Sequence, residues 1–107
     1  MSKLHLYPQS GSHSDGWLVG DREGLTALRD AISRVLDEPP PAARAQLFSS
    51  DGEGYSLVVV LQENPAVWDR LLLPYAKLED ARKDATHPWS ELDEGLYKSL
   101  LRPSSDR

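Results

Sequence analysis

The stretch VGDREGL at residues 19–25 decides how the chain begins to fold, because it joins a β-type apolar run to a run with helical spacing. A glycine-rich turn between a strand and a helix can bind phosphate through free backbone amides. Here Asp21 and Glu23 would place negative charge where the phosphate would bind, and neither a GxGxxG nor a GxxxxGK spacing is present. Asp21 instead suits a helix N-cap, and Glu23 complements the positive end of the helix dipole. The stretch therefore predicts a capped helix start and no phosphate site.

One amphipathic helix is expected from Arg22 to Asp37. Residues 39–41 are all proline, so the helix must end before them. The apolar side chains recur at helical spacing and therefore form one stripe, which we expect to face the core. The members of this stripe are Leu25, Leu28, Ile32, Val35 and Leu36.

Short strands are expected on both sides of this helix. Residues 4–7 and 17–19 are separated by a polar loop, so they can pair as a hairpin. Residues 45–48 and Tyr55–Gln62 flank Asp51-Gly52, which is a strong signal for a tight turn. The β-branched, apolar centre of Tyr55–Gln62 predicts the most buried strand.

Two structures are compatible with residues 64–75. Asn64 can cap a short helix that has Pro65 at its first position. Residues 68–73 can instead form a returning edge strand, because Pro74 disfavours helix at the residue before it. The strand is the interpretation that we favour here, since it would cover the open side of the buried strand.

The remaining C-terminal residues predict helix. Residues 76–85 are charged and helix-prone, and a last helix is expected to open at Thr86 or His87. Gly95 weakens that helix by roughly 1 kcal/mol relative to alanine. Its apolar stripe consists of Trp89, Leu92, Leu96 and Leu100.

These elements predict a single α+β domain over residues 1–107. A small, mainly antiparallel sheet packs on one central amphipathic helix, and the C-terminal helices cover an end of the sheet or the same face. The chain has 107 residues, of which 39% are hydrophobic, and this is enough for one core.

Composition excludes several classes of function. The chain contains no cysteine, which excludes disulfides and cysteine nucleophiles and fits a reducing cytoplasm, where we expect the protein to be located. Seventeen acidic residues against twelve basic ones give a formal net charge of −5, which argues against nucleic-acid binding and favours a basic partner. The apolar runs are too short for a signal peptide or a membrane span.

The sequence predicts no catalytic residue, no metal site and no cofactor. His5, His13 and His87 lie far apart without the spacing of metal ligands. The serines lack a GxSxG motif. Asp51 and Glu53 are two neighbouring carboxylates that could act as a general acid and base, but carboxylates in turns are usually solvated.

The order of these elements is similar to that in a known family of proteins. A strand, a GD-x-EGL turn, an amphipathic helix, a DGEG turn and an apolar strand together resemble the small bacterial immunity proteins of polymorphic toxin systems. The likeness covers roughly residues 16–62, about half of the chain, and in that family asparagine is commoner at the position of Asp21. It implies a non-enzymatic protein that binds and neutralises a cognate toxin, with no catalytic residue carried over. The matching residues are Gly20, Asp21, Glu23, Gly24 and Leu25, followed by Leu28.

The leading hypothesis is therefore a protein that binds a toxin or enzyme by protein–protein contact. The expected contact residues lie in or beside two loops, where aromatic rings anchor and charges steer a basic partner. They are Asp15, Trp17, Asp51, Glu53 and Tyr55. Two alternatives stay open: a small enzyme or ligand-binding protein with a pocket between the sheet and the C-terminal helices, or a structural subunit that oligomerises through a sheet edge.

Overall fold

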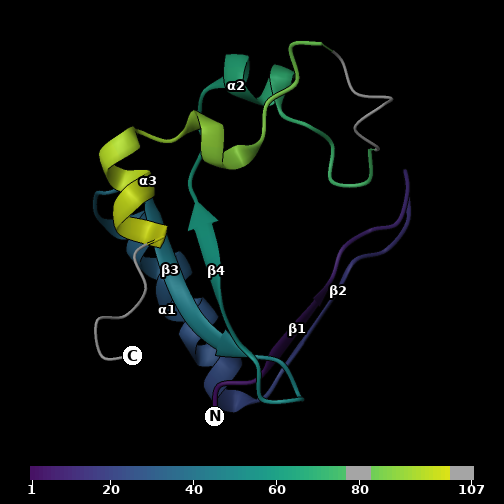
Figure 1. The fold of residues 1–107 in the computed structure, drawn as a ribbon, viewed down its shortest axis with the longest axis vertical. Coiled ribbons are helices and arrows are strands. Elements are labelled where there is room, and N and C mark those ends of the chain that lie inside the picture. Colours follow the sequence, from purple (N-terminus) through teal and green to yellow (C-terminus); the bar gives the residue numbers. More distant parts are fainter. Residues whose placement is uncertain (77–82, 102–107) are drawn as a thin grey trace.

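The computed structural model describes residues 1–76 and 83–101, and it confirms the predicted α+β fold. Figure 1 shows a long helix behind a strand pair, with a narrow two-stranded hairpin leaving the body at one end. The elements follow in the order β1 (Leu4–Tyr7), β2 (Trp17–Gly20), α1 (Arg22–Asp37), β3 (Ala42–Phe48), β4 (Gly54–Val60), α2 (Pro65–Arg70), the 3-10 helix η2 (Pro88–Glu91) and α3 (Glu94–Leu101).

The strands form two antiparallel pairs, where the sequence predicted one small sheet. β1 pairs with β2 over their full lengths, with Leu6 opposite Leu18. β3 pairs with β4 in the same way, and β3 begins earlier than predicted, at Ala42. The two pairs are joined through Lys3, which makes a parallel bridge to Phe48. Both predicted hairpins are therefore present, but β1 and β2 diverge from β3 and β4 beyond that bridge.

The start of α1 is fastened to the start of β1. The Oδ1 atom of Asp21 accepts hydrogen bonds from the backbone amides of Gly24, at 2.7 Å, and Lys3, at 3.1 Å. The Asp21 amide in turn donates to the Lys3 carbonyl oxygen, at 3.1 Å. A Cβ atom at Gly24 would lie 2.0 Å from that oxygen, so only glycine allows the chains to approach this closely. Asp21 is thus the predicted N-cap and also a link between two elements.

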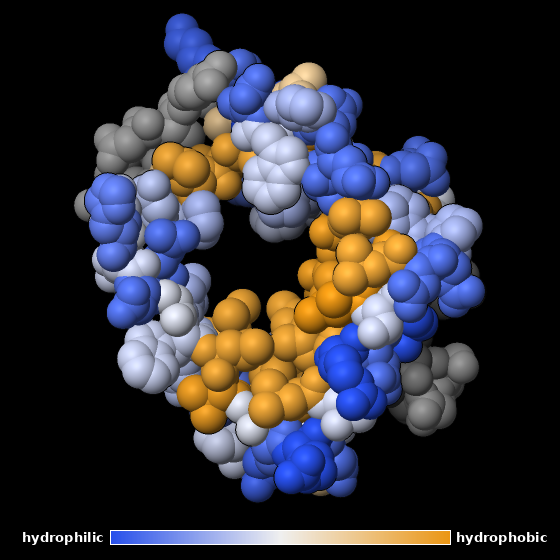
Figure 2. All heavy atoms as spheres, turned by 180° about the vertical axis from the view of Figure 1, so that it is seen from behind, coloured by the Kyte–Doolittle hydropathy of each residue, from blue (hydrophilic) through white to orange (hydrophobic). Residues whose placement is uncertain are grey.

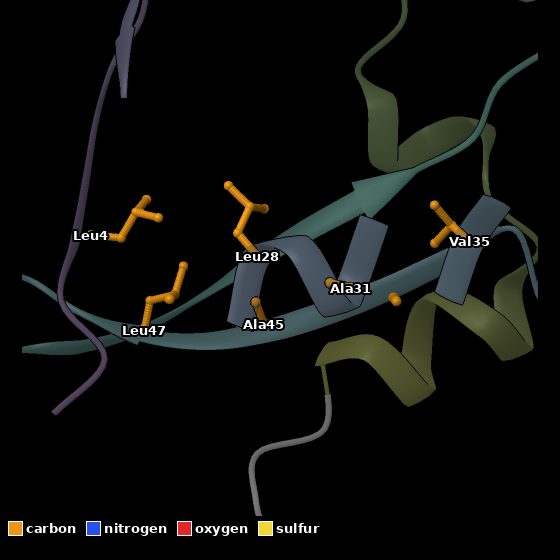
Figure 3. Close-up of a cluster of buried hydrophobic side chains, with 7 residues drawn as sticks. Leu4, Leu28, Ala31, Val35, Ala45 and Leu47 are labelled. Carbon is orange, nitrogen blue, oxygen red and sulfur yellow. The ribbon is translucent and has the colours of Figure 1, made fainter. Parts of the chain in front are cut away.

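The core lies between α1 and the strand pair β3–β4 (Figure 3). Alternate residues of β3 point toward α1, and two of them are alanines, so the helix packs close to this strand. The cluster consists of Leu4, Leu28, Ala31, Val35, Ala43, Ala45 and Leu47.

Only part of the predicted apolar stripe of α1 is buried. Leu28 and Val35 are buried as expected, whereas Leu25, Ile32 and Leu36 are 43%, 39% and 62% exposed. The reason is the position of the helix, which packs mainly against β3 and only lightly against β4. A central helix over both strands would have buried the whole stripe.

The favoured strand over residues 68–73 was wrong, because residues Pro65–Arg70 form helix α2. Asn64 caps this helix by accepting a hydrogen bond from the Ala66 amide at 3.0 Å, with Pro65 in the first turn. Local capping therefore outweighed the extended preference before Pro74. The chain becomes extended only at Leu71, which makes an isolated parallel bridge.

The predicted last helix is divided in two. Thr86 does not open a helix; it is the partner of Leu71 in the bridge, and the first turn after it is η2. Leu92 is extended, with a ψ of 148°, and this interrupts the predicted stripe. α3 then begins with Asp93 accepting from the Leu96 amide at 3.2 Å. Most of the helix predicted over residues 76–85 lies outside the described residues.

The C-terminal elements η2 and α3 cover the face of the strand pair that is opposite α1, whereas the sequence predicted that they cover an end of the sheet or the same face. Arg44, whose side chain points away from the core, donates from Nη1 to the Leu100 carbonyl oxygen at 3.2 Å. Val58 and Val60 on the same face line a cavity together with side chains of η2 and α3. None of the helices in the described part of the chain is long and apolar enough to cross a membrane.

We expect Asp21→Ala to lower the free energy of unfolding by about 1–2 kcal/mol, because it leaves the amides of Gly24 and Lys3 without an acceptor. Asp21→Asn retains an acceptor oxygen and should cost much less. The measurement is urea unfolding followed by circular dichroism, with Asp37→Ala at the exposed end of the same helix as the control. Equal stability of Asp21→Ala and the control would contradict the capping role.

Candidate protein-binding surface

The β1–β2 hairpin exposes large apolar side chains on both of its faces. Tyr7 lies opposite Trp17 on one face, and Leu6 lies opposite Leu18 on the other. All four are roughly half exposed or more, and Trp17 reaches 66%. Figure 1 shows that the hairpin extends away from the strand pair β3–β4. Beyond its root, which is the end at Leu4 and Gly20, none of the described residues covers either face enough to bury these side chains. Exposed apolar patches of this kind mark interaction surfaces.

The root of this hairpin is held against the β3–β4 turn by His5. The Ser50 amide donates to His5 Nε2 at 2.9 Å, and His5 Nδ1 lies 2.7 Å from the Tyr7 hydroxyl. Because a backbone amide can only donate, Nε2 is the acceptor and the proton of the neutral ring is on Nδ1. His5 therefore donates to Tyr7 and orients its ring, and the two rings meet edge to face at 5.8 Å.

Tyr55 makes a second connection between the strand pairs. Its hydroxyl donates to the Leu4 carbonyl oxygen at 2.5 Å, which links β4 to β1. Burial raises the pKa of the Tyr55 phenol, so the group stays protonated and remains a donor at neutral pH. Tyr55 is thus a structural link whose ring is half-buried at the edge of the core.

A broad, open cavity of about 520 Å³ lies between the hairpin root and the β3–β4 turn. Of the five contact residues predicted from the sequence, Asp51 and Tyr55 line it directly. Trp17 is next to it, as the cross-strand partner of Tyr7. The remaining lining residues are Leu4, His5, Leu6, Tyr7, Ser49 and Ser50.

Glu53 and Asp15 do not line this cavity. Glu53 is on the same turn as Asp51, and its amide donates to Asp51 Oδ1 at 3.1 Å, so the two acids are neighbours. Asp15 is exposed two residues before Trp17, in the loop at the far end of the hairpin. The structure therefore places Asp51, Glu53 and Tyr55 together and Asp15 apart from them.

Sequence reasoning missed His5, Leu6 and Tyr7 as part of this surface. Their strand was recognised, and the spacing of two between His5 and Tyr7 does place both rings on one face. The hydrogen bond from Ser50 to His5 joins residues that are 45 positions apart, and no local sequence pattern predicts such a contact.

Hydrophobic side chains also gather around a central hollow of the molecule, as Figure 2 shows. α1 packs mainly over β3, so it leaves side chains of the neighbouring strand β4 incompletely covered. Leu25 of α1 packs beside β2, since a Cβ atom at Gly20 would lie 3.1 Å from its side chain. On β4, Leu57 and Val59 are only half-buried. The core is thus open on the side of β4.

A second concave region lies where the alternative hypothesis placed a ligand pocket. Two cavities of about 320 Å³ each lie between β4 and the C-terminal elements, and they share Val60 and Pro88 in their walls. Their walls are mostly apolar, with Trp68 and Trp89 in the two cavities. His87 stacks on Trp89 with ring centroids 4.4 Å apart and an interplanar angle of 4°.

The charged side chain in these walls is already paired within the chain. Glu91 accepts two hydrogen bonds from Arg70, at 2.8 and 2.9 Å. The hydrogen bonds from Arg70 are the main reason why the pKa of Glu91 is lowered to about 2. The pair fastens η2 to the end of α2, and its carboxylate is not available as an acid or base at neutral pH.

No group of three or more histidine or acidic side chains in residues 1–76 and 83–101 is arranged to hold a metal ion. Comparisons of the chain with protein-family models, curated proteins and solved structures gave no match.

We expect Glu91→Gln to destabilise the protein most above about pH 5 and least near pH 2. The folded pKa of Glu91 is lowered from 4.5 to about 2, so the stabilisation is present above the unfolded value and is lost as the pH falls through the folded one. Denaturant unfolding between pH 2 and 7 measures the difference between variant and parent. Glu94→Gln removes the exposed pair with Lys98 and should show little pH-dependent loss; a parallel loss in both variants would contradict the assignment.

Proposed function

We propose that this chain is a non-enzymatic binding protein of the immunity or inhibitor type, which neutralises a bacterial toxin or enzyme by protein–protein contact in the cytoplasm. The observation that carries the proposal is the projecting β1–β2 hairpin, whose large apolar side chains remain exposed beside an acidic turn. Aromatic anchors with charged neighbours are typical of protein interfaces.

The root of the hairpin is already ordered in the free protein. His5 and Tyr55 fix β1 against the β3–β4 turn through the hydrogen bonds to Ser50 and Leu4. A surface that is already ordered loses less conformational entropy on binding than a mobile one does. This supports a contact centred on Tyr7 and Trp17, with the free part of the hairpin adjusting around the partner.

Charge favours a basic partner. Asp51 and Glu53 are exposed on the turn, and the whole chain has a formal net charge of −5. Opposite charge speeds association and discriminates among partners more than it raises affinity. The same charge disfavours nucleic acid, whose phosphates would be repelled.

The alternative ligand-binding function has one observation in its favour, the pair of apolar cavities between β4 and the C-terminal elements. An enzyme would need convergent free polar groups in such a cavity. The walls contain the polar side chains of Gln62, Glu91 and Tyr97, and Glu91 is paired with Arg70. The cavities therefore suit an apolar ligand better than a reaction.

The first prediction concerns the aromatic anchor. Partners are captured from a lysate of the source organism on the immobilised protein, identified by mass spectrometry and purified for interferometry. Trp17→Ala should weaken binding of the captured partner by about tenfold or more, mainly through faster dissociation. Leu36→Ala, an equally exposed apolar residue at the far end of α1, is the control. An affinity within about twofold of the parent for Trp17→Ala would contradict the proposal.

The second prediction concerns the electrostatic steering of association with the partner. Reversing Asp51 and Glu53 to lysine should slow association and flatten its dependence on salt, because the attraction to a basic partner is lost. Reversing Asp37 and Glu38 to lysine makes the same change in net charge at the end of α1. This double variant controls for the electrostatic field of the protein as a whole. If both double variants associate at the same rate, the turn is not the steering site.

A further inference from the structure

β4 is an edge strand that lacks the usual protection against pairing. β3 lies on one side of it, and no described residue pairs with its other side. Natural edge strands are usually shielded by charged side chains, proline or bulges. Residues 54–62 contain neither a charged residue nor a proline. A free edge of this kind readily accepts an added strand.

The hydrogen bonds at the two ends of the ladder show which backbone groups are free. The Leu61 amide donates to the Pro41 carbonyl oxygen at 2.8 Å, and the Ser49 amide donates to the Glu53 carbonyl oxygen at 2.9 Å. In an antiparallel pair the bonded residues alternate along each strand. The residues of β4 between them therefore direct both backbone groups away from β3. These residues are Gly54, Ser56, Val58 and Val60.

The side chains beside this edge are also incompletely covered. Tyr55, Leu57 and Val59 point to the core side of the strand pair, yet each is only half-buried, because α1 lies over β3. Figure 2 shows hydrophobic side chains gathered around a central hollow of the molecule. A strand added to β4 would place alternate side chains beside these residues, on the same face of the sheet, and extend the core.

We propose that β4 binds an extended segment of the partner protein, which adds as a strand and carries lysine or arginine at both ends. This deepens the proposed function and rests on it. Glu53 and Glu63 lie just beyond the two ends of the uncharged stretch, and both are exposed. Neither carboxylate forms an ion pair within the described residues. The edge therefore presents an apolar strand with a negative charge at each end.

The same charges argue against a second copy of this chain as the occupant. An antiparallel pair of two β4 strands centred on Val58 would place Glu53 of each copy opposite Glu63 of the other. Like charges that lie directly opposite destabilise a strand pair. A segment with a basic residue at each end converts both repulsions into attractions, and this is why we assign the edge to a basic partner.

A synthetic peptide tests strand addition without the natural partner. It has eleven residues, the length from Glu53 to Glu63, alternates valine and threonine, and carries a lysine at each end. Titration calorimetry of the full chain should show saturable binding at concentrations up to about 1 mM. The same peptide with glutamate at each end should bind about tenfold more weakly at low salt, and the difference should shrink as salt is added.

Amide exchange followed by NMR locates the peptide. The amides of Ser56, Val58 and Val60 should exchange rapidly in the free protein and about tenfold more slowly when the lysine-ended peptide is saturating. The Leu57 and Val59 amides, which donate to β3, should be slow in both states. A peptide N-methylated on the amides of one edge, so that it cannot donate to β4, should bind weakly and give no alternating protection.

Val58→Pro removes one outward amide without breaking the ladder to β3, and Val58→Thr keeps that amide as the matched control. The proline variant should bind the lysine-ended peptide about tenfold more weakly, whereas the threonine variant should stay within about twofold. If Val58→Pro does not fold, the amide exchange pattern of the parent protein with the bound peptide decides whether the peptide adds as a strand. Binding without alternating protection, or no binding of the lysine-ended peptide, would overturn strand addition. Either result leaves the proposed function standing, because Trp17→Ala tests that function separately.

Discussion

The contact between the Lys3 backbone and the first turn of α1 is the constraint on which the rest of the structure depends. Asp21 accepts from two amides, one in each element, and Gly24 leaves room for the Lys3 carbonyl oxygen. Lys3 also bridges to Phe48, so β1, β3 and α1 meet at one point near the start of the chain. Because the root of β1 is fixed there while its other end leaves β3, the hairpin has to project.

The position of α1 follows from the same junction and from the small residues of β3. Ala43 and Ala45 allow the helix to pack closely on β3, and this draws it away from β4. The result is a core that is complete around Leu28 and Val35 and open beside β4. An open core with an unshielded strand edge is unusual for an isolated domain, because a two-stranded sheet is only marginally stable without further packing. A partner that supplies a strand would extend both the sheet and the core.

The elements with strong local signals could be predicted from the sequence. Asp21, the prolines after Asp37 and the Asp51-Gly52 turn set the bounds of α1 and of the second hairpin without reference to the rest of the chain. Two features could not be predicted from the sequence, because both depend on packing between distant segments. They are the placement of α1 over β3 and the division into two strand pairs. The same holds for Leu92, whose extended backbone ends η2 inside an otherwise helical stripe. For the surface, aromatic and acidic residues in loops pointed to Tyr55 and Asp51, while the link from His5 to Ser50 had no local signal.

The distribution of polar and apolar groups supports the proposal that the chain binds a protein and does not catalyse a reaction. Two of the polar side chains next to the cavities make bonds within the chain: His5 to Ser50 and Tyr7, and Glu91 to Arg70. A catalytic acid or base would have to be free to exchange a proton with a substrate, and these contacts oppose that. Large apolar side chains of the hairpin and the backbone groups of β4 instead remain open. An apolar surface beside an open strand edge matches the chemistry of another polypeptide, which offers side chains and backbone groups together.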